Sequence, residues 1–166
     1  KGAVLLFSQD PDNYLPVVYT RFEGVECMNY SPFIYAYEKE NLAITGGGIL
    51  DGQGDNTAWW PWTGSAKYGW KAGMPRHQKD RNNLFQMAED GIPVNQRVFG
   101  KGHYLRVNFI QFYKCSNILI EGITIKRSPM WEIHPVLCNN ITVHKVRIVS
   151  HGPNNDPPMP RQYGPT

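Results

Sequence analysis

At 166 residues, with 41% hydrophobic and 19% charged residues, the chain has the size and balance of one globular domain. Its formal charge of +3 is small and no run of Lys and Arg forms a stripe, which argues against a nucleic-acid partner. The apolar stretches are too short to cross a bilayer and the three cysteines form no CxxC pair, so we expect neither a membrane span nor a metal or other cofactor.

The first predicted strand covers residues 41–44, where Asn is followed by alternating apolar positions. Before it, the chain starts at Lys1 with no signal-peptide pattern, which leaves the compartment undetermined. After it comes a glycine-rich segment at 46–54 (GGGILDGQG). Such a segment can bind phosphate, but the Lys-Ser/Thr of a P-loop is absent and no helix pattern follows, so a nucleotide site is not expected.

A long insertion at about residues 53–105 interrupts the pattern, and we predict it to be a loop. It carries four tryptophans, Trp59, Trp60, Trp62 and Trp70. Loops inserted into a repeat often emerge on the binding face, and flat indole rings suit stacking on sugars. For any single tryptophan we favour the alternative, in which the ring packs the insertion onto the rest of the fold as a small core of its own.

An internal repeat follows the insertion. Residues 111–120 (QFYKCSNILI) align with residues 134–143 (HPVLCNNITV) at a constant offset of 23 residues, and the match continues with alternating apolar positions up to Ile125 and Ile148. Short strands that recur at such a period indicate a solenoid, in which each coil buries its apolar side against the next. We therefore predict an all-β chain that forms a right-handed, single-stranded parallel β-helix of the pectate-lyase type.

Asparagine recurs at equivalent turns of this predicted solenoid. Asn41, Asn117 and Asn140 each precede an apolar residue at the start of a strand. Stacked amides can hydrogen-bond along the axis, and Asn tolerates tight turn geometry. The alternative is that Asn is merely common in turns.

Several segments resemble, in the same order, the polygalacturonases of glycoside hydrolase family 28. They are residues 46–54 with the following Trp59-Trp60, then residues 108–112 (NFIQF), 117–125 (NILIEGITI) and 128–135 (SPMWEIHP). The S-P-x-W-x-x-H-P segment is typical of bacterial exo-acting and rhamnogalacturonan-type members. The resemblance implies that residues 1–166 are the N-terminal part of a catalytic domain, incomplete at the C-terminus and closest to bacterial exo-acting members.

Residues 154–156 (Asn-Asn-Asp) are similar to the Asn-Thr-Asp signature of this family, in which the Asp is catalytic. The resemblance implies that Asp156 is a water-activating base and that Asn154 binds substrate. The repeat supports this placement, since one period of 23 residues leads from Ile133 to Asp156 and from Trp131 to Asn154. From the residues alone, an Asp after two Asn is more often part of an Asx-turn.

Other substrate contacts are implied by the same resemblance. Trp131 and His134, one predicted coil before Asp156, are expected to contact the sugar, and Trp59 and Trp60 to form part of a sugar-facing wall. Taken as a residue alone, His134 at a strand end is at least as well explained by a structural role.

The resemblance implies inverting hydrolysis of α-1,4-galacturonosyl linkages, in pectic polysaccharide or oligogalacturonides, by a secreted or periplasmic enzyme. This chemistry needs two carboxylates, and the family's acid belongs to an Asp-Asp pair that does not follow Asp156 here. The tail at 157–166 instead has four prolines, which cannot extend a sheet ladder. We therefore expect the isolated chain to be inactive and to self-associate through an open C-terminal face.

Alternative functions remain open. One is a noncatalytic β-helix module that binds sugar through the Trp-rich insertion. Another is a rhamnogalacturonan hydrolase. A third is a pectate-lyase-like protein, which would need Ca²⁺ and clustered acidic ligands, a pattern that the sequence does not show.

Overall fold

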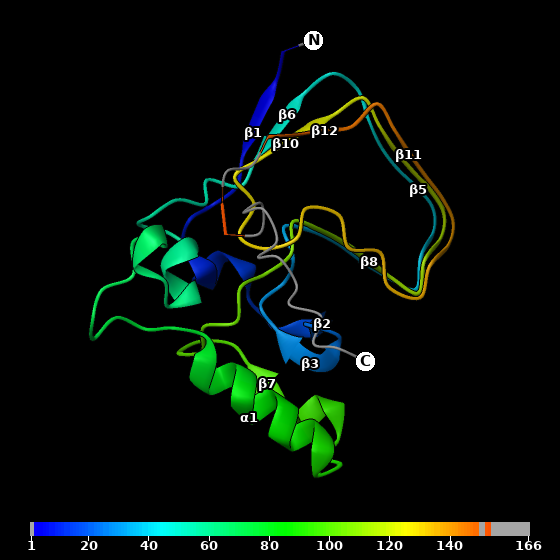
Figure 1. Ribbon diagram of the computed structural model, residues 1–166. Helices are drawn as coiled ribbons and strands as arrows, with labels where there is room; N and C mark the ends of the chain where they lie inside the picture. The colour runs from blue at the N-terminus through cyan, green and yellow to red at the C-terminus, as the bar shows by residue number, and fades with distance from the viewer. Residues whose placement is uncertain (1, 150–151, 154–166) are drawn as a thin grey trace, which may run out of the picture.

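The computed structural model describes residues 2–149 and 152–153 (Figure 1). The strands in this part of the chain are β1 (Val4–Leu6), β2 (Val18–Phe22), β3 (Val25–Asn29), β4 (Ile34–Tyr37), β5 (Glu40–Thr45), β6 (Ile49–Asp51), β7 (Val98–Phe99), β8 (Ile110–Tyr113), β9 (Ser116–Glu121), β10 (Thr124–Lys126), β11 (Asn139–His144) and β12 (Arg147–Val149). The helices are α1 (Gln78–Glu89) and four short 3-10 turns, η1 (Pro11–Tyr14), η2 (Trp60–Thr63), η3 (Ala66–Tyr68) and η4 (Val94–Gln96).

Parallel sheets stack the chain into coils. The strand orders are β1-β6-β10-β12, β11-β9-β5 and β4-β8. Ile141 pairs with Ile118 and Ile148 with Ile125, so the predicted 23-residue repeat is the register of the last two coils. Figure 1 looks along the stack, where β6, β10 and β12 overlie one another and β5 and β11 do the same. The predicted β-rich architecture of parallel strands is confirmed.

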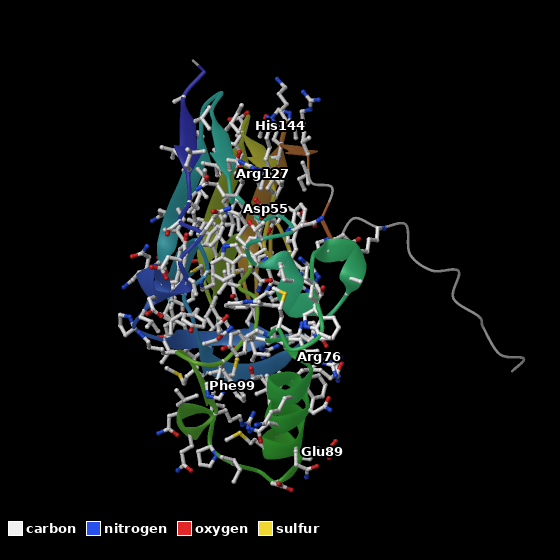
Figure 2. The ribbon with its side chains drawn as sticks, turned by 90° about the vertical axis from the view of Figure 1, so that its left-hand side faces the viewer. Asp55, Arg76, Glu89, Phe99, Arg127 and His144 are labelled. Atoms are coloured by element: carbon white, nitrogen blue, oxygen red, sulfur yellow. The ribbon has the colours of Figure 1, made fainter. Side chains whose placement is uncertain are left out.

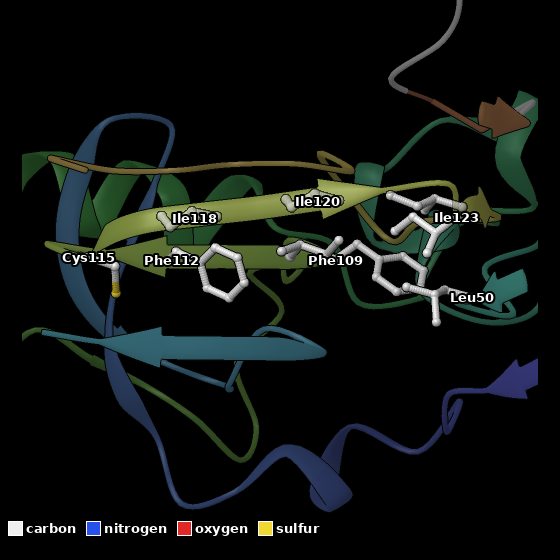
Figure 3. Close-up of a cluster of buried hydrophobic side chains, with 9 residues drawn as sticks. Leu50, Phe109, Phe112, Cys115, Ile118, Ile120 and Ile123 are labelled. Atoms are coloured by element: carbon white, nitrogen blue, oxygen red, sulfur yellow. The ribbon is translucent and has the colours of Figure 1, made fainter. Parts of the chain in front are cut away.

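The apolar core fills the inside of these coils. In β9, Ile118 and Ile120 are buried while the residues between and beside them are more exposed, as the period of two along a strand requires. Figure 3 shows their packing with Phe109, Phe112, Cys115 and Ile123 of the same coil and with Leu50 of a neighbouring coil. The alternating apolar residues of the repeat therefore face one continuous core.

The predicted asparagine ladder is confirmed. Asn117 Nδ2 donates to Asn41 Oδ1 at 3.0 Å, and Asn140 Nδ2 donates to Asn117 Oδ1 at 2.7 Å. The three residues have φ values of 58°, 55° and 51°, in the left-handed region that Asn tolerates better than most residues. The same residue type thus serves the turn and the contact between coils.

The prediction of an all-β chain is wrong in one element, because the insertion contains α1. The helix is largely polar, with Leu84 fully buried, so its sequence shows no clear apolar stripe at helical spacing. Leu84 packs with Phe22, Phe99 and Met130, which come from β2, β7 and the turn after β10. The helix is thus stabilised by contacts with distant segments rather than by its own periodicity.

An antiparallel hairpin and free thiols complete the described structure. Strands β2 and β3 pair antiparallel, which the repeat did not predict. Cys27 and Cys115 are buried free thiols, and Cys138 is a partly buried one. Among the described residues, no helix has the length and hydropathy of a membrane span, and no group of three His, Cys, Asp or Glu is placed to hold a metal.

The outer strands of the stack expose apolar side chains. Leu137, Ile141, Val143 and Ile148 of the last described coil are exposed, as are Val4, Leu5 and Leu6 of β1. Self-association through the C-terminal face stays a prediction.

Candidate functional site

The ends of β6, β10 and β12 lie at one edge of their sheet. Asp51 pairs with Lys126, and Lys126 with Val149, so the turns that leave these three strands follow from aligned positions. We call the turns at residues 52–55 and 127–131 the ledge. The predicted catalytic residue Asp156 and its neighbour Asn154 follow β12, but both lie outside the described residues.

Gly52 and Gly54 form a GxG motif at the end of the glycine-rich segment, and they allow the two turns of the ledge to touch. A Cβ on Gly52 would lie 2.7 Å from Arg127 O, and one on Gly54 would lie 2.8 Å from the same carbonyl and 2.6 Å from Trp60 Nε1. Gly54 N also donates to Arg127 O at 2.9 Å. The motif is therefore explained by close backbone approach.

Replacement of Gly54 by Ala is expected to destabilise the protein by about 1–3 kcal/mol, because the added methyl group forces the ledge turns apart. The free energy of unfolding in urea measures the effect. Gly47→Ala is the matched control, since a Cβ there meets nothing within 4 Å. Equal stability of the two variants would contradict this account of the motif.

An ion pair crosses the ledge. Arg127 donates through Nε to Asp51 Oδ1 at 2.8 Å and through Nη2 to Asp51 Oδ2 at 2.7 Å, and Gln53 N also donates to Asp51 Oδ1. Burial raises the pKa of Asp51, but the hydrogen bonds from Arg127 and Gln53 outweigh it, and the pKa lies below its usual value. Asp51 is therefore a charged structural residue at neutral pH.

Asp55, which lies within the ledge itself, also makes structural hydrogen bonds. Its Oδ1 accepts hydrogen bonds from the backbone N–H of Thr57 at 2.7 Å and of Ala58 at 2.9 Å, and from the Thr57 hydroxyl. Figure 2 labels Asp55 and Arg127 in this part of the molecule. The described ledge thus supplies no uncommitted carboxylate for acid-base chemistry.

Trp59 and Trp60, predicted to line a sugar-facing wall, are buried. Trp59 is 2% exposed and Trp60 9% exposed, and both pack with Tyr30, Tyr68 and Val107. Neither ring offers an open face to a ligand in the described structure. The placement supports the alternative weighed for them, in which they form a core that joins the insertion to the coils.

Trp60 connects the ledge to the segment that leads to Asp156. Its Nε1 donates to Ser128 O at 2.9 Å, on the far side of the GxG turn. A Cβ on the buried Gly152 would lie 2.7 Å from two carbons of the indole, so Gly152 rests directly on this ring. Sequence reasoning missed this contact, although Gly152 is four residues before Asp156.

Trp131 and His134 lie together on the segment that follows β10. Their rings meet edge to face with centroids 4.7 Å apart, and Trp131 is 37% exposed. Within the described chain, His134 Nε2 has no hydrogen-bond partner, whereas its Nδ1 lies 2.9 Å from Asn108 Nδ2. An accessible indole beside an available ring nitrogen can contact a sugar, and this role for the two residues stays a prediction.

The pKa of His134 is shifted by its surroundings. Burial, assisted by the charge of Arg21, lowers the pKa of His134 below its usual value, so the ring is neutral at neutral pH. The Asn108 side chain that contacts His134 also places its Nδ2 3.5 Å from Gln111 Oε1. The Thr20 hydroxyl donates to the same oxygen, at 2.5 Å. We did not single out these three buried polar residues from the sequence, although Asn108 and Gln111 belong to the 108–112 motif.

Comparisons with known proteins confirm the resemblance read from the motifs. No protein-family model matches the chain. It is 27% identical over 165 residues to a probable polygalacturonase of Vitis vinifera, covering 94% of this chain and 26% of that protein. It is 57% identical, with a TM-score of 0.91, to the crystal structure of a hyperthermoactive exopolygalacturonase from Thermotoga maritima, covering 92% of this chain and 34% of that one. The chain therefore spans about a quarter to a third of these relatives.

Proposed function

We propose that this chain is the N-terminal part of the catalytic domain of a pectin-hydrolysing glycosidase of the polygalacturonase type. The observation that carries the proposal is the similarity to the Thermotoga exopolygalacturonase, at 57% identity and a TM-score of 0.91 over 92% of the chain. A right-handed, single-stranded parallel β-helix is the fold that goes with this function. Secretion or export to the periplasm is part of the same proposal, since pectic polysaccharide lies outside the cell.

The proposed reaction is inverting hydrolysis of α-1,4-galacturonosyl linkages. Asp156 removes a proton from the attacking water, while a second carboxyl group protonates the departing glycosidic oxygen from the opposite face. Because Asp51 and Asp55 both accept structural hydrogen bonds, neither is assigned as this acid. Asn154, Trp131 and His134 are the proposed substrate contacts.

A noncatalytic sugar-binding module is the second candidate. The absence of an uncommitted carboxylate on the described ledge favours it for the isolated chain. Trp131, exposed at the end of the ledge, would then provide the binding surface.

Release of reducing ends from polygalacturonate distinguishes the two candidates. We expect the full-length protein to release them, and the isolated 166-residue chain to release none. Proton NMR of the first products is expected to show the β-anomer, because inversion of an α-linkage produces it. Lasting binding of the polymer by the full-length protein without release would instead establish the binding module, and an α-anomer would refute the inverting mechanism.

A further inference from the structure

The insertion contains a hollow that none of the residues discussed above lines. It lies between the beginning of α1 and the turn at residues 102–104, and has a volume of about 460 Å³. This size is within the range of small-molecule sites, about 300–1,000 Å³. Its polar lining consists of Arg76, Lys79, Asp80, Asn83, His103 and Tyr104.

The floor of the hollow is held in place by Asp80. This residue is 8% exposed, its Oδ1 lies 2.8 Å from His103 Nδ1, and its Oδ2 accepts from the backbone N–H of Tyr104 at 2.7 Å. Both carboxylate oxygens are thus engaged in hydrogen bonds within the protein. His103 and Tyr104 are fixed to α1 by the same contacts.

The rim of the hollow carries two uncompensated cations. Arg76 and Lys79 are exposed, and within the described chain neither forms an ion pair. Arg76 lies over the ring of Trp70, with its guanidinium carbon 5.3 Å from the ring centroid, which holds the group at the rim and leaves its N–H donors available. By contrast, Arg21, Arg81 and Arg127 all pair with carboxylates.

Packed side chains connect the hollow to the candidate site. Leu84, one helical turn after Asp80, packs against Met130, which directly precedes the exposed Trp131. Tyr104 also meets Trp62 edge to face, with centroids 5.2 Å apart. Figure 2 shows Arg76 near the end of α1 that faces the coils and Glu89 at the opposite end. Arg76 therefore lies toward the coils, beyond the short helices η2 and η3 that separate the hollow from the ledge.

We propose that this hollow is an accessory binding site for a uronate unit of the substrate. Arg76 and Lys79 would bind the sugar carboxylate, while Asn83, His103 Nε2 and the Tyr104 hydroxyl offer hydrogen bonds to the ring hydroxyls. The inference rests on the proposed function for the class of ligand, an acidic sugar chain. It adds a site in the insertion for a unit remote from the bond that is cleaved.

Calorimetric titration of trigalacturonate into the full-length Asp156→Asn protein tests the proposal. Arg76→Gln/Lys79→Gln is expected to weaken binding by about tenfold, since the loss of charge-assisted contacts is worth at least that factor. Lys39→Gln/Lys114→Gln is the matched control, because it removes two exposed cations at turns outside the insertion. The methyl-esterified trisaccharide, which lacks the charges, is expected to bind both double variants equally.

A second measurement locates the ligand directly. Trigalacturonate is expected to protect Arg76 from modification by phenylglyoxal, as read by mass spectrometry, and the methyl ester is not. Equal affinity of the two double variants together with an unprotected Arg76 would overturn the proposal. Hydrolysis of polygalacturonate by the wild-type protein is measured separately. If the binding results overturn the accessory site but the wild-type protein hydrolyses the polymer, only the accessory site is refuted. If the wild-type protein does not hydrolyse the polymer, the proposed function fails as well.

Discussion

Asp156→Asn is expected to lower the kcat of the full-length protein for polygalacturonate by about 10²–10⁴-fold, the usual contribution of a general base. The amide has nearly the same shape as the carboxylate but cannot accept a proton from the attacking water. Since the sugar contacts proposed for Trp131 and His134 are untouched, KM should change little. Initial rates of reducing-end release over a range of polymer concentrations give both constants.

The matched control is Asp90→Asn, which makes the same chemical change at an exposed residue after α1. It is expected to leave kcat and KM unchanged. If Asp156→Asn retained the full kcat, Asp156 would not be the base, and the motif match at residues 154–156 would reflect an Asx-turn alone.

Trp60→Ala is expected to destabilise the protein by about 3–5 kcal/mol, the usual cost of removing a buried tryptophan. The substitution leaves a cavity between the GxG turn and Gly152, and removes the hydrogen bond from Nε1 to Ser128 O. Urea denaturation measures the loss. We also expect the kcat of the folded variant to be lower than that of the wild type, even after the unfolded fraction is accounted for. The reason is that the segment before Asp156 loses its contact with the indole at Gly152.

Two further substitutions separate the roles of the tryptophans. Trp60→Phe keeps most of the packing but leaves Ser128 O without its donor, so a loss of about 1–3 kcal/mol is expected. Trp131→Ala, at a 37% exposed ring, should barely change stability and should instead weaken sugar binding. An equal stability loss for Trp60→Ala and Trp131→Ala would contradict the assignment of Trp60 to the core.

The repeat could be recognised in the sequence because it follows from the local geometry of strands and coils. Side chains alternate along a strand, and coils in register repeat the same residue types at the same offset, so Asn117 and Asn140 already indicate their contact in the sequence. The insertion follows no such rule. Helix α1 depends on the burial of Leu84 by residues of β2, β7 and the turn after β10, which no local window contains.

The sequence by itself determined the parallel strands, the 23-residue register and the resemblance to polygalacturonases, and it indicated the asparagine ladder as one of two readings, since these rest on periodicity and on short contiguous motifs. Only the tertiary structure decided what the tryptophans and glycines do. Trp60 meets Ser128, 68 residues away, and Asp51 meets Arg127, 76 residues away. Such contacts depend on how neighbouring coils pack against each other, and the burial of a side chain is a property of that packing rather than of the residue.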